Sequence, residues 1–309
     1  MELPADPMRY ARQHRLALAM VCTTLVLIAF GAMVTSTGSG MAFADWPRAD
    51  GEWMPERALS TLDGFLEHFH RIIAAIVGLM MLTLLVWAGR AAADQPWLRR
   101  LLIGGLALVV TQGLFGGIGV LLELPVFTSA THGVLAQVTL ATFTVILFAL
   151  SPRCAQQAVV DPDKLRSARK WVWIGLFALI LQTAFGAIAR HSVVPNNHAL
   201  WSHVVNAFAV FLLLIVMSGI LAGKLGSSVP GVNRASRVLM TLLVLQVALG
   251  FVALLVRRDK HPENIQFLWR ASLISAHVLT GAFLTMTTAH MLALVRLGAR
   301  PAPASVPPR

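Results

Sequence analysis

Four histidines recur along the apolar part of the chain, one in every second apolar segment, and they are His70, His132, His203 and His277. Each lies about one to two helical turns from the same end of its segment. Burying an ionisable side chain in lipid is costly, so a histidine there indicates a functional site. Four unrelated core histidines would rarely repeat at matched depth. The pattern therefore predicts that the four imidazoles bind the same kind of group.

The chemistry of these ligands favours haem iron. Zinc and copper sites usually combine histidine with cysteine or carboxylate ligands at close spacing, whereas these histidines come singly from separate segments. Neutral imidazoles on two facing helices hold a haem iron from both sides. We therefore expect two bis-histidine haems. The internal repeat described below pairs His70 with His132, and His203 with His277.

Glu67 adds a carboxylate to one of these pairs. It lies three residues before His70 in the stretch Glu67-His68-Phe69-His70-Arg71, so the two side chains share a helix face. Either it orients a ligand or pairs with Arg71, or it handles a proton or stabilises positive charge at a haem edge. The equivalent positions before the other histidines hold no carboxylate. The two haem sites are thus expected to differ, as a substrate haem beside a cofactor haem would.

Haem propionates require cations or N–H donors near the same ends of the segments. Six basic residues are candidates, with ordinary snorkelling to the membrane interface as the alternative for each. These residues are Arg71, Arg190, Arg257, Arg258, Lys260 and Arg270.

Eight apolar segments position these side chains. The chain of 309 residues is 57% hydrophobic and 13% charged, with a mean hydropathy of +0.71, which excludes a disordered chain, a nucleic-acid-binding domain and a water-soluble enzyme. Runs of about twenty apolar residues span a bilayer as helices, because lipid satisfies no backbone polar group. An all-α membrane protein is expected, with helices near 16–35, 66–88, 98–122, 127–150, 170–189, 199–222, 235–256 and 270–295.

The basic residues indicate the orientation. Seventeen lie in the termini and loops on the same side of the membrane as the N-terminus, seven lie in the loops on the opposite side, and Arg71 lies within a segment. Cytoplasmic loops are rich in Lys and Arg, so both termini are expected in the cytoplasm. The same loops explain the net charge of +11, which therefore does not indicate nucleic-acid binding. The first segment is too long for a signal peptide and is expected to remain as a helix. Cys22 and Cys154 are not expected to form a disulfide.

The segments repeat a pattern of glutamine followed four residues later by glycine. Gln112 and Gly116, Gln182 and Gly186, and Gln246 and Gly250 show it, whereas Leu27 replaces the glutamine before Gly31. The repeat predicts two pseudo-symmetric four-helix halves, residues 1–155 and 156–309, joined by the polar stretch 151–170. Close helix packing and a role beside a ligand explain the pattern equally well.

These residues resemble the haem A synthase family, eight-helix membrane enzymes that make haem A for cytochrome oxidase. The resemblance rests on the Glu-x-x-His-Arg stretch at 67–71, on Thr37-Gly38-Ser39-Gly40 and Asp45-Trp46-Pro47, and on the single histidines of the later segments. It covers all eight segments. The chain departs from the family pattern in lacking an arginine shortly before the glycine turn, where Thr35 or Ser36 stands, and a cysteine pair in the first outer loop.

The resemblance implies oxidation of the C8 methyl group of haem O to the formyl group of haem A. It implies that His70 and His132 ligate the substrate haem in the N-terminal half, and that His203 and His277 ligate a haem b cofactor in the C-terminal half. Glu67 would be the catalytic carboxylate. The implied setting is the bacterial cytoplasmic membrane, with haem O synthase and the cytochrome oxidase assembly machinery as partners and an unidentified electron carrier.

Two other functions remain open from the residues alone. A di-haem b-type cytochrome that relays electrons is favoured by bis-histidine ligation, and a haem transporter or chaperone would need weak, exchangeable ligands. Glu67, present in one half only, favours the haem-modifying enzyme.

Overall fold

The computed structural model describes residues 8–192, 197–256 and 265–303, and within these ranges eight helices are long and apolar enough to cross a membrane. The eight predicted segments are therefore confirmed, and the chain is an all-α, multi-pass membrane protein. The long helices are α1 (Ala11–Thr37), α3 (Leu62–Ala91), α4 (Pro96–Leu121), α5 (Val126–Ala149), α7 (Pro162–His191), α8 (Asn197–Leu225), α9 (Val232–Val256) and α10 (Ile265–Arg296).

All eight long helices begin before the start of their apolar segments, and in two of them a side chain caps the early start. The Asp161 side chain accepts hydrogen bonds from the backbone N–H groups of Asp163 and Lys164, at 2.9 Å each, and so caps α7. Thr61 Oγ1 accepts from the N–H of Gly64 at 3.3 Å and caps α3. Capping satisfies N–H groups that have no partner within the helix. Polar first turns therefore extend these helices beyond the lipid-spanning part.

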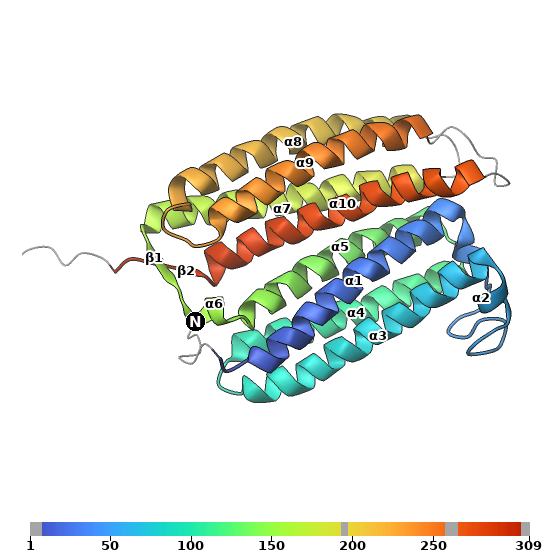
Figure 1. Ribbon diagram of the computed structural model, residues 1–309, viewed down its shortest axis with the longest axis horizontal. Helices are drawn as coiled ribbons and strands as arrows, with labels where there is room; N and C mark the ends of the chain where they lie inside the picture. The colour runs from blue at the N-terminus through green and yellow to red at the C-terminus, as the bar shows by residue number, and fades with distance from the viewer. Residues whose placement is uncertain (1–7, 193–196, 257–264, 304–309) are drawn as a thin grey trace, which may run out of the picture.

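The helices form two neighbouring groups (Figure 1). In the first, α1 contacts α3, α3 contacts α4, α4 contacts α5, and α5 contacts α1; α7, α8, α9 and α10 contact one another in the same cyclic way. Helices α1 and α5 meet α10, and α5 also meets α7, along the boundary between the groups. This arrangement is compatible with the expected halves 1–155 and 156–309, whose separate roles remain a prediction.

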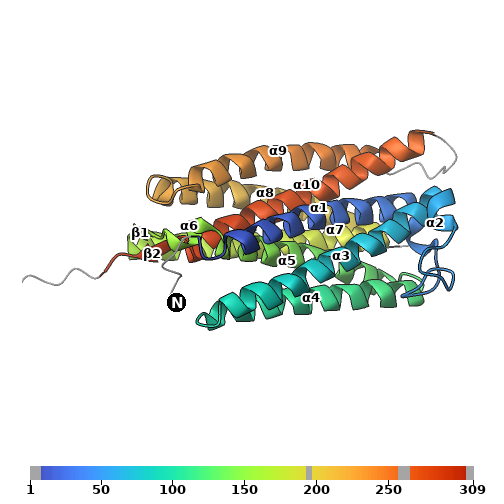
Figure 2. The ribbon, with the colours of Figure 1, turned by 60° about the horizontal axis from the view of Figure 1, so that its bottom comes forward.

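Burial differs sharply between central and peripheral helices. In the most apolar 18-residue window, 67% of α10 is buried inside the protein, compared with 17% of α4 and 11% of α9. Helices α4 and α9 lie at opposite extremes of the molecule (Figure 2). Lipid-facing apolar side chains are expected of peripheral membrane helices, because lipid solvates them. Helix α10 is therefore the most buried of the eight long helices.

Short elements complete the chain. They are the 3₁₀ helix η1 (Ser39–Met41), the helices α2 (Arg57–Ser60) and α6 (Pro152–Ala155), and the strands β1 (Ala158–Val160) and β2 (Ala299–Pro301). The two strands pair in parallel, with Ala158 opposite Ala299. They join the stretch between the two helix groups to the residues that follow α10 (Figure 1).

Candidate functional site

The four histidines lie in two facing pairs. His70 of α3 and His132 of α5 have ring centroids 6.5 Å apart with an interplanar angle of 72°. His203 of α8 and His277 of α10 have centroids 6.4 Å apart at 87°. The structure thus brings together the residues that the repeat paired, in two arrangements of nearly the same geometry. Their role as ligands remains a prediction.

The spacing of the rings suits one metal ion between them. An imidazole nitrogen lies about 2 Å from a bound metal and about 1 Å from the centre of its own ring. Two rings on opposite sides of one iron therefore have centres about 6 Å apart, close to the values in both pairs. Among the described residues, no group of three or more His, Cys, Asp or Glu side chains could hold a metal. Two facing imidazoles suit haem, whose porphyrin supplies the remaining nitrogen ligands.

Each histidine ring packs against a glycine of the preceding long helix. A Cβ added at that glycine would stand 2.8 Å from the ring Cε1 atom in two cases and 3.1 Å in the other two. The pairs are Gly31 with His70, Gly116 with His132, Gly186 with His203, and Gly250 with His277. The glycine of the repeat therefore serves close packing, and the group that approaches it is the imidazole.

The glutamine of the repeat bonds to the same histidine. In the Gln112–His132 pair, His132 Nδ1 lies 3.1 Å from the backbone oxygen of Gln112, and Gln112 Nε2 donates to the backbone oxygen of His132 at 3.0 Å. In the Gln182–His203 pair, the corresponding distances are 3.2 Å and 2.9 Å. His203 Nδ1 also lies 3.1 Å from the amide nitrogen Nε2 of Gln182, so either tautomer of His203 finds a partner there. At His132, where Nδ1 faces the carbonyl oxygen of Gln112, Nδ1 carries the proton and Nε2 keeps its lone pair for a metal. This tautomer fits iron ligation.

The other two histidines are held differently. Gln246 Nε2 lies 3.3 Å from His277 Nε2. At His70 the neighbouring backbone is that of Leu27, whose side chain offers no amide. Within the described part of the chain, the Nδ1 atoms of His70 and His277 have no hydrogen-bond partner. A glutamine side chain therefore contacts three of the histidines, and Leu27 takes its place at His70.

Glu67 is 3% exposed and lies beneath the loop that follows α1. Its Oε2 accepts from the N–H of Phe43 at 3.2 Å, and its Oε1 pairs with the guanidinium of Arg71, one turn further along α3. The structural role expected for this carboxylate, pairing with Arg71, is present. Its chemical role remains a prediction.

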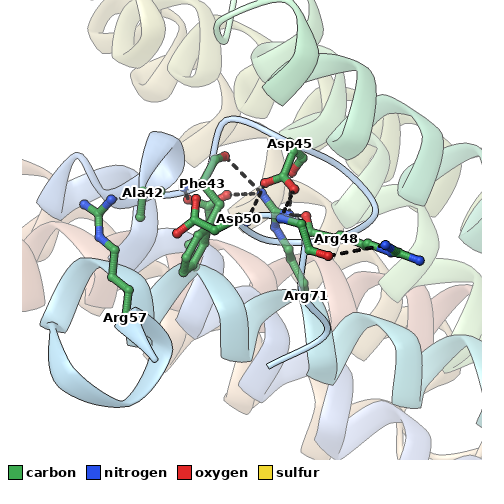
Figure 3. Close-up of polar contacts among 9 residues, drawn as sticks. Ala42, Phe43, Asp45, Arg48, Asp50, Arg57 and Arg71 are labelled. Carbon is green, nitrogen blue, oxygen red and sulfur yellow. Dashed lines mark hydrogen bonds and ion pairs between the residues drawn. The ribbon is translucent and has the colours of Figure 1, made fainter. Parts of the chain in front are cut away.

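Arg71 organises the same loop (Figure 3). It donates to the backbone oxygens of Asp45 at 2.8 Å, Arg48 at 2.9 Å and Phe43 at 3.3 Å. Arg57 donates to the backbone oxygen of Ala42 at 2.8 Å. Two arginines from the helices thus fix a loop with little secondary structure. The propionate contact expected of Arg71 remains a prediction.

Asp45 closes a turn in this loop. Its carboxylate accepts from the backbone N–H groups of Asp50 and Gly51, at 2.8 Å each. Chiefly the bond from Gly51 holds the pKa of this carboxyl below its usual range. Asp50 and Gly51 have φ angles of 52° and 76°, a backbone region that glycine adopts at little cost.

Arg190 reaches from the end of α7 to α1. It donates to the backbone oxygen of Ala32 at 2.8 Å and to Ser36 Oγ at 2.6 Å, and Ser36 Oγ lies 3.1 Å from Ser275 Oγ in α10. The family pattern expects an arginine shortly before the glycine turn. Here a cation from another helix stands beside Ser36, a relation that sequence spacing does not reveal.

The remaining candidates are less informative. Arg257, Arg258 and Lys260 lie outside the described residues. The Arg270 guanidinium lies 5.7 Å from the ring centroid of Trp269. His68, expected to be a bystander, is buried, and neither of its ring nitrogens has a hydrogen-bond partner among the described residues.

Both cysteines are free, as expected.

Comparison with known proteins identifies the family. Residues 14–194, which include Glu67, His70 and His132, match the family described as cytochrome oxidase assembly protein. The chain is 27% identical over 180 residues to a "Heme A synthase" of Geobacillus kaustophilus, covering 57% of this chain and 55% of that protein. The match to a "Heme A synthase" of Symbiobacterium thermophilum is 34% over 117 residues, covering 38% and 37%.

A longer match includes most of the C-terminal half. It is 25% identical to a "Heme A synthase" of Lysinibacillus sphaericus over 267 residues, 78% of this chain and 85% of that protein. The first relative is matched over only about half of its length. Since the family match spans more than half of the 309 residues, the chain belongs to the cytochrome oxidase assembly protein family.

Proposed function

We propose that this protein is a haem A synthase, which oxidises the C8 methyl group of haem O to the formyl group of haem A for cytochrome c oxidase. The observation that carries the proposal is the buried Glu67–Arg71 pair one turn from the facing rings of His70 and His132. Relatives named heme A synthase support the same conclusion. The enzyme would be an oxidoreductase acting on a CH group.

In this proposal the two histidine pairs have different tasks. His203 and His277 would hold a haem b cofactor, and His70 and His132 would hold the substrate haem O. When bound, the iron porphyrins supply the redox chemistry that oxidises a methyl group. The chain supplies the imidazoles at matching spacing and the glycine surfaces that position them.

Glu67 would act on the N-terminal haem site. Three residues separate it from His70, so the carboxylate and the imidazole lie on one face of α3. An anion at this position would stabilise positive charge that develops at the porphyrin edge, or would take up a proton there. The N–H of Phe43 and the Arg71 guanidinium hold the carboxylate in place. The residues three before the other histidines are Ser129, Leu200 and Ile274.

The near-identity of the two ring pairs favours one alternative function. Centroid distances of 6.5 and 6.4 Å describe equally a cytochrome with two haems of type b that relays electrons. That alternative gives no task to a carboxylate found in one half only. Conversion of haem O to haem A separates the two functions, because only the enzyme would carry it out.

The proposed setting is the bacterial cytoplasmic membrane with both termini in the cytoplasm. Seventeen basic residues against seven support this orientation. It places the histidine pairs and the loop of Asp45 near the outer surface. Partners would be haem O synthase, the oxidase assembly machinery and an electron carrier.

The test compares Glu67→Gln with the wild type and with Glu56→Gln, a control at an exposed position of the same outer loop. Each protein is produced with a source of haem O, and its extracted haems are identified by chromatography and mass. We expect haem A from the wild type and the control, and unaltered haem O with full haem content from Glu67→Gln. Haem A from Glu67→Gln would remove the catalytic role. Unmodified haem from the wild type would favour the cytochrome.

A further inference from the structure

We propose that a groove between the end of α3 and the start of α4 binds an anionic phospholipid. Arg90 and Arg99 would hold the headgroup phosphate, and apolar residues further along α3 would contact an acyl chain. Arg90 lies twenty residues beyond His70 on α3, about 30 Å along the helix. The site is therefore at the other end of the molecule from the histidine pairs, and the inference does not depend on the proposed function.

The groove lies between two neighbouring helices at the edge of the molecule (Figure 2). Its volume is about 560 Å³, and its lining includes Arg90 of α3 together with Arg99 and Ile103 of α4. A second hollow of about 410 Å³ is lined by α3 residues that include Leu82 and Val86. The two hollows share Val86 and Arg90. Together they lead from a pair of arginines to an apolar surface.

The two arginines form no ion pair with any residue that the structure describes. Asp94, the acidic residue in the connection between α3 and α4, is already paired with Arg9, which donates to its two carboxylate oxygens at 2.7 and 2.6 Å. Arg90 and Arg99 are both exposed. Their positive charges are thus available to an anion, and a guanidinium group matches the geometry of phosphate with its parallel N–H donors.

The apolar part of the groove favours a lipid over a soluble anion or an acidic protein segment. Leu82 and Val86 are 46% and 43% exposed on a helix that is apolar enough to cross a membrane. Eight residues, about 12 Å of helix, separate Leu82 from Arg90, so one phospholipid can contact both. The proposed orientation places the groove in the cytoplasmic leaflet, where anionic lipids attract basic residues and bind in basic pockets between helices.

Native mass spectrometry of the purified holoprotein tests the site with two lipids that have the same acyl chains, palmitoyl-oleoyl phosphatidylglycerol and palmitoyl-oleoyl phosphatidylcholine. We expect the first lipid molecule to bind more tightly when it is phosphatidylglycerol. An arginine near an anionic membrane surface strengthens binding about fivefold. The double variant Arg90→Gln, Arg99→Gln should therefore weaken phosphatidylglycerol binding about 30-fold and leave phosphatidylcholine binding unchanged.

The matched control is the double variant Arg234→Gln, Arg237→Gln. It removes two exposed arginines from the start of α9, on the same side of the membrane but outside this groove. It should keep the phosphatidylglycerol affinity of the wild type. Glycerol phosphate, which has no acyl chains, should not displace the lipid.

Gly89→Leu tests the apolar part of the groove while both arginines are kept. Gly89 lines the groove, and a Cβ added there would meet only Leu85 Cδ1 at 3.7 Å, an ordinary contact. The fold should therefore tolerate the larger side chain, which circular dichroism checks. The leucine should fill the groove and weaken phosphatidylglycerol binding.

Each contrary result has a distinct meaning. Equal affinities of the wild type for the two lipids, or the same loss of affinity in both double variants, would overturn the site. Displacement by glycerol phosphate would show a site for soluble anions and overturn the lipid as its occupant. If the double variant in the groove fails to fold, Gly89→Leu decides, and an unchanged phosphatidylglycerol affinity in that variant refutes the proposal.

Discussion

Gly186→Ala is expected to expel the proposed cofactor haem, because the added methyl group would occupy the space of the His203 ring. The new Cβ would stand 2.8 Å from Cε1 and 3.0 Å from Nδ1 of His203. Carbon atoms in contact prefer about 3.5–4.0 Å, so the ring must retreat by roughly 0.7 Å or more. Ligand positions at a metal are held to about 0.2 Å. The imidazole therefore cannot keep both its place and its metal bond.

The size of the effect follows from overpacking. Forcing an extra methyl group into a packed site costs about 1–3 kcal/mol, which corresponds to haem binding weakened by about fivefold to 150-fold. The assay is the haem b content per protein together with the absorbance of the reduced bis-histidine form. Gly219→Ala is the control, because it lies in α8, the helix that carries His203, and its added Cβ would meet nothing within 4 Å.

The control should keep its haem and even gain slightly in helix stability, since alanine is a better helix former than glycine. Full haem content and an unchanged spectrum in Gly186→Ala would refute the view that this glycine positions the ligand. Loss of haem in both variants would show that α7 and α8 tolerate no added methyl group, and would remove the specific link to His203.

Three further predictions concern the outer loop and the cysteines. Arg71→Met should lower the melting temperature of the purified protein, because it leaves the buried Glu67 charge unpaired at a cost of about 3–5 kcal/mol. Arg71→Lys should recover part of the lost stability. Equal melting temperatures for Arg71→Met and the wild type would contradict this. Because the folded-state pKa of Asp45 lies below its usual value of 3.8, the turn should be fully stable above that pH and lose stability as pH falls through the lowered pKa. Hydrogen exchange at the Asp50 and Gly51 amides should show this, and Asp45→Asn should abolish it. Burial raises the pKa of the Cys154 thiol to about 12, so a water-soluble maleimide at neutral pH should label Cys154 only after denaturation. Rapid labelling of Cys154 itself in the folded protein, distinguished from Cys22 by peptide mass, would contradict its burial.

The sequence predicted the membrane helices because lipid leaves few alternatives to a helix in a long apolar run. It missed the early starts of α3 and α7, where the polar residues Thr61 and Asp161 act as caps. It also missed the β1–β2 pair. Segments of three residues such as Ala-Val-Val and Ala-Arg-Pro show no alternation, and their pairing depends on a contact between distant parts of the chain.

The facing histidines could be predicted because one histidine recurs in each repeat unit. The glycines and glutamines were visible as a pattern, but their function depends on how closely two helices approach, which spacing within one helix does not give. The contacts of Arg71 with the outer loop were also hidden, although its pairing with Glu67 was expected. Its acceptors are the backbone carbonyls of Phe43, Asp45 and Arg48, and every residue has such a carbonyl.

The parallel pairing of β1 with β2 has a consequence for biosynthesis. This pairing joins residues 158–160 to residues 299–301, so it cannot form until synthesis has passed the last membrane-spanning helix, α10. Proteins begin to fold from the N-terminus while they are being made. Residues 158–160 would therefore lack their strand partner through about the second half of translation, and the pairing of the two strands would be among the final steps of folding in the bilayer.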